Sequence, residues 1–196
     1  MYKLDDDLKY TWKKRGYPRQ THLENRSCGH TKHTLNIDSK GRLFHCTCDG
    51  WLPFNNGKLL DFNSIEEIFA SPVARKLQQS TELGSSFKFC NTLHCNIRNF
   101  SLFTNPDQDP SRNFIIGVDD SCNLQCASCR NQLIYFKKGP VFEYRKRTMQ
   151  HFSKLLTEDQ RPSKITIGGN GDAFASVVYK DFLYNLDLRD DQILIL

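Results

Sequence analysis

Three cysteines stand close together in the segment SCNLQCASCR, residues 121 to 130. Cys122, Cys126 and Cys129 follow a C-x3-C-x2-C spacing, and no fourth cysteine lies nearby in the sequence. A structural zinc site uses four ligands, whereas three thiolates can hold three irons of a 4Fe-4S cluster and leave the fourth iron open to a small molecule. An open coordination position is typical of a catalytic metal site.

The other five of the eight cysteines lie in the first half of the chain. No secretory leader and no apolar run long enough to cross a bilayer stands out, so we expect a cytoplasmic protein. Because the cytosol keeps thiols reduced, metal or redox chemistry is favoured over disulfides. Four thiolates can converge from three segments on a second metal group, namely Cys28, Cys46, Cys90 and Cys95. Cys48 is either a fifth candidate ligand or takes no part in metal binding. The histidines beside these cysteines are interpreted as neighbours of the metal site rather than as ligands.

The segment 104–112, with two prolines among polar residues, reads as a linker between two modules. Before it, residues 25–103 predict a small irregular α+β module. Alternating apolar positions around an Asp-Ser-Lys-Gly turn indicate a hairpin over 34–46. Ser64 and Glu67 form a capping box for one helix, and Ser71-Pro72 begins a second helix that runs to about Leu83.

After the linker, residues 113–196 predict an α/β fold. Strand patterns in 112–120, 163–169 and 192–196 alternate with helix patterns in 141–156 and 176–186. This alternation predicts a parallel sheet, in which chemistry is found at the carboxyl ends of the strands. The three-cysteine motif follows the first strand, and the turn GGNGDAFAS, residues 168 to 176, follows the second.

A C-x3-C-x2-C motif in the loop after the first strand of an α/β sheet resembles the radical S-adenosylmethionine superfamily. The resemblance implies the N-terminal half of a partial (β/α)6 barrel with parallel strands, a 4Fe-4S cluster on Cys122, Cys126 and Cys129, and bound S-adenosylmethionine. It implies reductive cleavage of that cofactor to a 5′-deoxyadenosyl radical, with electrons from a low-potential donor such as flavodoxin or ferredoxin. Asn170, Gly171 and Asp172 occupy the place of the family's cofactor-binding Gly-Gly-Glu-Pro turn, with changes at the first glycine and the proline.

The hairpin, the segment SIEEIFASPVARKLQ with its two helices and the run CNTLHC resemble the SPASM/twitch extension of radical enzymes, here placed before the barrel. This implies an auxiliary iron-sulfur cluster on the first cysteine group, which would give two clusters, and a peptide or protein substrate. Since the family barrel has six units, the three strands here are expected to need a further barrel half, from a longer product or a separate partner.

Two other functions remain open at this point. The basic segment 1–24, with aromatic residues among its lysines and arginines, would suit a zinc-binding nucleic-acid module. The two cysteine groups would also suit a two-cluster electron carrier, although four cysteines per cluster are usual there. We expect neither nucleic acid nor a membrane as a partner.

Overall fold

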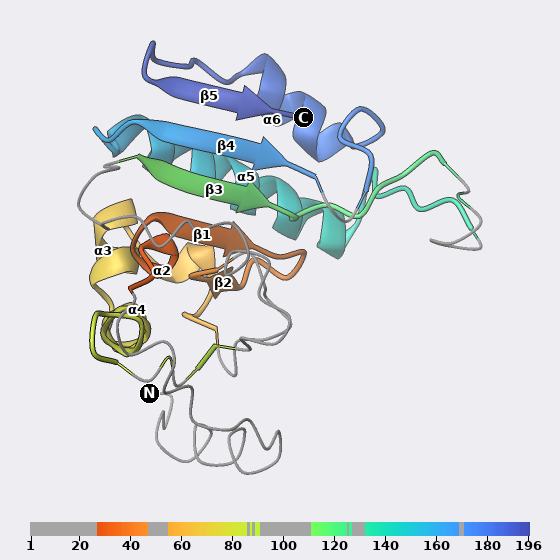
Figure 1. Ribbon diagram of the computed structural model, residues 1–196. Coiled ribbons are helices and arrows are strands. Elements are labelled where there is room, and N and C mark those ends of the chain that lie inside the picture. The colour runs from red at the N-terminus through yellow and green to blue at the C-terminus, as the bar shows by residue number, and fades with distance from the viewer. Residues whose placement is uncertain are drawn as a thin grey trace.

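The computed structural model describes residues 27–46, 55–85, 87, 89–90, 111–124, 126, 132–168 and 171–196. Its centre is a five-stranded sheet in the order β2-β1-β3-β4-β5 (Figure 1). Only β1 and β2 pair antiparallel, and the other neighbours pair parallel. The strands are β1 (Thr34–Ile37), β2 (Leu43–Phe44), β3 (Arg112–Ile116), β4 (Ser163–Ile167) and β5 (Gln192–Ile195).

The second half follows the predicted order of strands and helices. Helix α5 (Pro140–Glu158) connects β3 to β4, and α6 (Val177–Tyr184) connects β4 to β5. Proline starts α5, and the Ser176 side chain caps α6 by accepting a hydrogen bond from the Tyr179 N–H at 3.0 Å. Both helices pack on the same face of the sheet (Figure 1), where Phe114, Phe152 and Phe182 share one apolar core. The α/β class and the parallel strands are thus confirmed.

The first half contains the predicted hairpin and helices, with two short helices in addition. Gly41, at φ +70°, completes the β1–β2 turn, and α3 (Ile65–Ala70) and α4 (Pro72–Ser80) follow. The Glu67 N–H donates to the Ser64 hydroxyl, but the Glu67 carboxylate accepts from the Asn63 N–H, one residue before the expected partner. Short helices α2 (His30–His33) and η2 (Leu59–Asp61) were not predicted, and α4 ends at Ser80 rather than near Leu83.

The hairpin does not stand apart from the second half. Strand β1 pairs parallel with β3, with Leu35 opposite Phe114 and Ile37 opposite Ile116. All four residues of β1 are buried, as expected for a strand that lies inside a sheet. The two expected modules therefore contribute strands to one sheet. The predicted linker 104–112 falls mostly outside the described residues, and Arg112 already belongs to β3.

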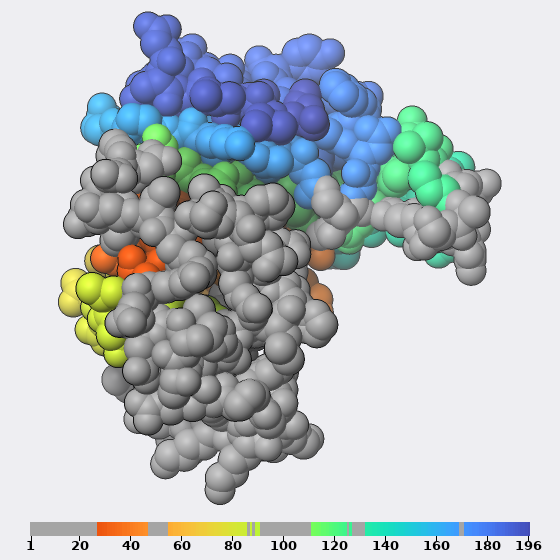
Figure 2. Space-filling view, viewed as in Figure 1, coloured from red at the N-terminus to blue at the C-terminus, as the bar shows by residue number. Residues whose placement is uncertain are grey.

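The surface of the described residues shows two further features. The described residues of the segment after β3, coloured green to teal, extend beyond the carboxyl ends of the strands (Figure 1 and Figure 2). Strand β5 forms the edge of the sheet opposite β2. The Ile193 side chain on this strand is 61% exposed, and Leu196 comes directly after the strand. Within the described residues, no helix has the length and apolarity needed to cross a membrane.

Candidate functional site

The carboxyl ends of β3 and β4 lie side by side, because the two strands are parallel neighbours with Ile116 opposite Ile167. The loop with Cys122 leaves β3 at this edge, and the turn with Gly171 leaves β4 there. Two motifs that are about fifty residues apart in the sequence are thus brought to one place, as parallel pairing predicts.

Of the three motif cysteines, the structure describes two. Cys122 is 8% exposed, and its backbone N–H donates to the Ile134 carbonyl at 2.8 Å, while the Ile134 N–H donates back at 3.3 Å. This bridge joins the start and the return of the projecting loop. Cys126 is exposed, and Cys129 lies outside the described residues. The loop therefore has a fixed base at Cys122.

Gly171 packs directly against the backbone before Cys122. A methyl group built on Gly171 would lie 2.5 Å from the Ser121 carbonyl oxygen and 3.0 Å from the Asp119 carbonyl oxygen. The neighbouring Asp172 N–H donates to the same Ser121 oxygen at 2.9 Å. Only glycine permits this close approach of two backbones. The Asp172 N–H is thus already hydrogen-bonded within the protein. Asn170, the first residue of the expected cofactor-binding set, lies outside the described residues.

A buried carboxylate, Asp119, anchors the same region. Its Oδ1 accepts hydrogen bonds from the Ser121 N–H and the Ser121 hydroxyl, each at 3.0 Å. Its Oδ2 accepts from the Ser176 hydroxyl at 2.6 Å. Asp119 is 1% exposed, so its charge depends on these partners. One side chain therefore connects the loop after β3 with the start of α6.

Arg145 of α5 neutralises this charge. Its Nη1 donates to Asp119 Oδ1 at 2.8 Å, and its Nη2 donates to Asp120 Oδ2 at 2.6 Å. The guanidinium also lies over the Phe136 ring, 4.2 Å from the ring centroid. Arg145 is 5% exposed. The planar fork of an arginine suits two carboxylates at once, and its face suits an aromatic ring.

Tyr179 completes the network from α6. Its hydroxyl accepts from the Asp119 N–H at 2.9 Å and lies 3.3 Å from the Ile116 carbonyl oxygen, to which it donates. Burial of the phenol raises the pKa of Tyr179 above its usual value of 10, and the hydrogen bond from the Asp119 backbone lowers the pKa by less. The hydroxyl therefore stays protonated at neutral pH.

Asp119, Arg145 and Tyr179 were not predicted as site residues. A signal for Arg145 does exist, because it falls on the apolar face of α5 with Met149 and Phe152. A charge on the buried face of a helix requires a partner, and Asp119 and Asp120, directly after a buried strand, are suitable carboxylates. Apolar periodicity alone does not pair residues that are 26 positions apart.

The described cysteines of the first group lie around α4. The Cys28 N–H donates to the carbonyl of Thr81, the residue after α4, at 2.9 Å. Cys46 packs against an apolar cluster that includes Leu77 of α4 and Phe89, the residue before Cys90. The structure thus brings Cys46 near the segment that carries Cys90. Cys48 and Cys95 lie outside the described residues, as does the basic segment 1–24.

His45, beside Cys46, is a core residue. It is fully buried, and its Nε2 lies 2.8 Å from the Asn56 amide nitrogen, which also donates to the Ile68 carbonyl. Burial and, to a smaller extent, the positive charge of Arg112 together lower the pKa of His45 to about 4. The ring is therefore neutral at pH 7.

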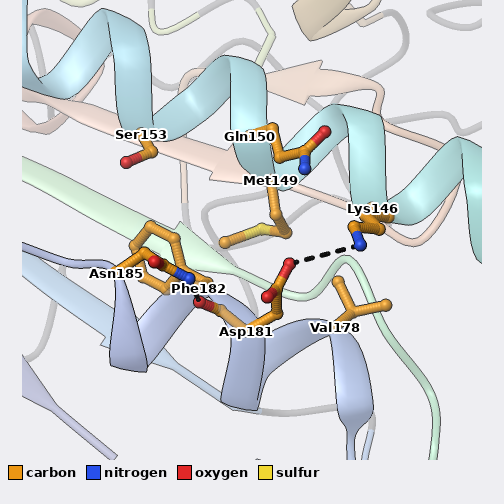
Figure 3. A pocket seen from close by; sticks show the side chains of 8 residues that line it. All are labelled: Lys146, Met149, Gln150, Ser153, Val178, Asp181, Phe182 and Asn185. Carbon is orange, nitrogen blue, oxygen red and sulfur yellow. Dashed lines mark hydrogen bonds and ion pairs between the residues drawn. The ribbon is translucent and has the colours of Figure 1, made fainter.

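A separate groove lies between α5 and α6, with a volume of about 350 Å³. Lys146 and Asp181 form an ion pair of 3.7 Å across it (Figure 3). The groove shares none of its lining residues with the network around Asp119. It is thus distinct from the site at the strand ends.

Comparison of the chain with protein-family models, with curated proteins and with solved structures finds no match. Among the described residues, no three His, Cys, Asp or Glu side chains lie close enough together to hold a metal ion. Cys28, Cys46 and Cys90, three of the four expected auxiliary ligands, are all described and do not form such a group, whereas Cys95 and Cys129 lie outside the described residues. The candidate site is therefore defined by the geometry of β3, β4, α5 and α6.

Proposed function

We propose that this chain belongs to the radical S-adenosylmethionine enzymes, with a catalytic 4Fe-4S cluster on Cys122, Cys126 and Cys129. The observation that carries the proposal is the contact of Gly171 and Asp172 with Ser121. This contact puts the glycine turn against the residue before the first motif cysteine, at the carboxyl edge of a parallel sheet. Such an edge is where α/β folds bind their ligands.

The residues present fit the group. Three thiolates are suitable iron ligands, and they leave one iron open for a small molecule. When bound, the cluster would supply the one electron that cleaves a carbon-sulfur bond of S-adenosylmethionine, giving methionine and a 5′-deoxyadenosyl radical that takes a hydrogen atom from a substrate. The chain's own contribution is to hold Cys122 in a buried position, bridged to Ile134, and to keep the turn of Gly171 at contact distance from that loop.

In this proposal the run β3-α5-β4-α6-β5 contributes the first three strands of a partial barrel, and a SPASM/twitch-like auxiliary cluster is held by Cys28, Cys46, Cys90 and Cys95. Cys46 packs against the apolar cluster that contains Phe89, the residue before Cys90, and this supports the auxiliary site, but Cys28, Cys46 and Cys90 are not gathered into one metal-holding group. A low-potential electron donor such as flavodoxin or ferredoxin, and a peptide or protein substrate, complete the proposal.

Metal analysis tests the proposed function. After anaerobic reconstitution, we expect about eight irons and eight sulfides per chain, and about four of each when Cys122, Cys126 and Cys129 are all replaced by alanine. The matched control replaces Cys28, Cys46, Cys90 and Cys95 and should keep the catalytic cluster. Stoichiometric zinc without sulfide would favour a zinc-binding module instead.

The cofactor separates an enzyme from an electron carrier. Addition of S-adenosylmethionine should change the electron paramagnetic resonance spectrum of the reduced wild-type cluster, because the cofactor binds the open iron. The triple-alanine variant should show no such change, and the control variant should retain it. A wild-type spectrum that does not respond to the cofactor would favour a two-cluster carrier.

A further inference from the structure

Both candidate motifs are attached to one carboxylate. Through Oδ1, Asp119 holds Ser121, which directly precedes Cys122. Through Oδ2, Asp119 holds Ser176, which directly follows the turn that begins at Gly171. The turn also closes on itself, because the Ser176 N–H donates to the Asp172 carbonyl at 3.2 Å. A displacement of Asp119 would therefore move the cysteine loop and the glycine turn together.

Arg145 determines where this carboxylate lies. It binds Asp119 and Asp120 with separate nitrogens, and its guanidinium covers Phe136 on the returning part of the loop. The Phe136 N–H donates in turn to the Ser121 hydroxyl at 3.2 Å. Arg145 thus contacts both ends of the projecting loop from a long helix that packs in the core.

We propose that Arg145 is a positioning residue, which acts through Asp119 to fix the Cys122 loop and the Gly171 turn as one unit. This inference rests on the proposed function only for the roles of the two positioned parts, which are a cluster ligand and a cofactor-facing turn. Arg145 itself is not assigned a contact with either group. The coupling between the loop and the turn is a property of the polypeptide and can be measured without metal.

Hydrogen exchange of the full chain, read by mass spectrometry, tests the coupling. Arg145→Lys keeps the positive charge but cannot span two carboxylates with a planar fork. We expect amide exchange to become about ten- to a hundredfold faster in both 118–124 and 171–176, as for the loss of one hydrogen bond to a charged group. Exchange in β1 should stay unchanged. The matched control is Arg147→Lys, which alters an exposed arginine of the same helix.

A second pair of variants covers the case in which Arg145→Lys does not fold. Ser176 and Ser64 both cap helices through their hydroxyls, but only Ser176 also donates to Asp119. Ser176→Ala should therefore speed exchange in 118–124, which is more than 50 residues away in the sequence. Ser64→Ala should affect only α3.

The outcomes separate this inference from the proposed function. Faster exchange in both segments supports the positioning role, even if the wild-type chain binds no iron, in which case only the proposed function fails. Faster exchange in one segment alone, or in neither, overturns the positioning role. When loaded with iron, the Arg145→Lys variant should retain its iron. Its electron paramagnetic resonance spectrum in the presence of S-adenosylmethionine should differ from that of the wild type. A wild-type spectrum in that variant would also overturn the role.

Discussion

At the scale of single residues, the site depends on atoms that have no room to move. Gly171 lies so close to Ser121 that any side chain would push one backbone away from the other. Asp119, Arg145 and Tyr179 are each at least nine-tenths buried; Arg145 binds the Asp119 carboxylate, and the Tyr179 hydroxyl accepts from the Asp119 N–H. Substitutions here are expected to alter the position of Cys122 as well as stability.

Gly171→Ala should lower the free energy of unfolding by about 1–3 kcal/mol, the usual cost of an extra methyl group in a packed region. It should also speed hydrogen exchange at Ser121 and Cys122. Gly84→Ala is the control, because Gly84 has a φ of +81° but no atoms within 4 Å of an added methyl. That control should cost about 1 kcal/mol from backbone strain and leave the cysteine loop unchanged. Equal effects of both variants on the loop would contradict the steric argument.

Tyr179 gives a pH-dependent prediction. Its pKa is raised in the folded protein, so the folded state favours the neutral phenol. This contribution to stability is fully present below the unfolded pKa of about 10 and is lost as the pH rises above that value, because only the unfolded chain then releases the proton. Denaturant unfolding measured between about pH 8 and pH 11 should show a decline that is smaller in Tyr179→Phe.

The same variant makes a second, pH-independent prediction. At neutral pH, Tyr179→Phe removes the acceptor for the buried Asp119 N–H and should cost about 1–3 kcal/mol of unfolding free energy. Denaturant unfolding at pH 7 checks this value. A stability equal to that of the wild type would show that another group accepts the N–H.

At the scale of elements, Arg112 joins the two halves of the molecule at the start of β3. It is 2% exposed, and its guanidinium lies 3.8 Å from the centroid of the Phe69 ring. Its Nη1 donates to the Lys32 carbonyl at the end of α2, and its Nη2 donates to Glu66 of α3. One side chain thus connects β3 with two helices of the first half.

Arg112→Met should reduce the unfolding free energy by about 1–3 kcal/mol, because it removes the stacked guanidinium and leaves the Lys32 carbonyl without this donor. Glu66→Gln is the matched control, since the Glu66 side chain is 60% exposed and the ion pair is screened by solvent. It should cost no more than about 1 kcal/mol. Denaturant unfolding of both variants checks the difference, and equal costs would assign the effect to the ion pair alone.

At the scale of the whole molecule, the two halves share one core. The largest apolar cluster contains Leu35, Ile37 and Ile68 from the first half together with Phe114, Phe152 and Ile165 from the second. The His151 Nε2 of α5 also lies 2.8 Å from the Phe62 carbonyl oxygen. A division of the chain into independently stable modules is not expected from this packing.

We therefore predict that residues 111–196, expressed without the preceding part, do not fold cooperatively. Without β1, strand β3 would present an unpaired edge, and the apolar side chains that meet Leu35 and Ile37 would be exposed to water. Circular dichroism during thermal unfolding checks this, with the full chain as the control. A sharp transition in the fragment would show that the second half is a module in its own right.

Several features follow from the sequence alone, because their causes are local. Ser64, Ser71 and Ser176 begin helices through hydrogen bonds that span three residues, and the Asp38–Gly41 turn makes the hairpin. The alternation of strands and helices after residue 111 determined the order of β3, α5, β4, α6 and β5. The spacing of Cys122, Cys126 and Cys129 determined the proposed chemistry.

Only the tertiary structure decided which distant residues meet. The pattern of β1 identifies a strand but not the edge of β3 as its neighbour, because alternation along a strand does not encode its partner. The apolar face of α5 contains Arg145, but its carboxylates become neighbours only when α5 packs on the sheet. The sequence places Gly171 in a glycine-rich turn, but only the parallel pairing of β3 and β4 brings it against Ser121. These contacts join residues far apart in the sequence, where the gain from packing and charge neutralisation depends on the whole fold.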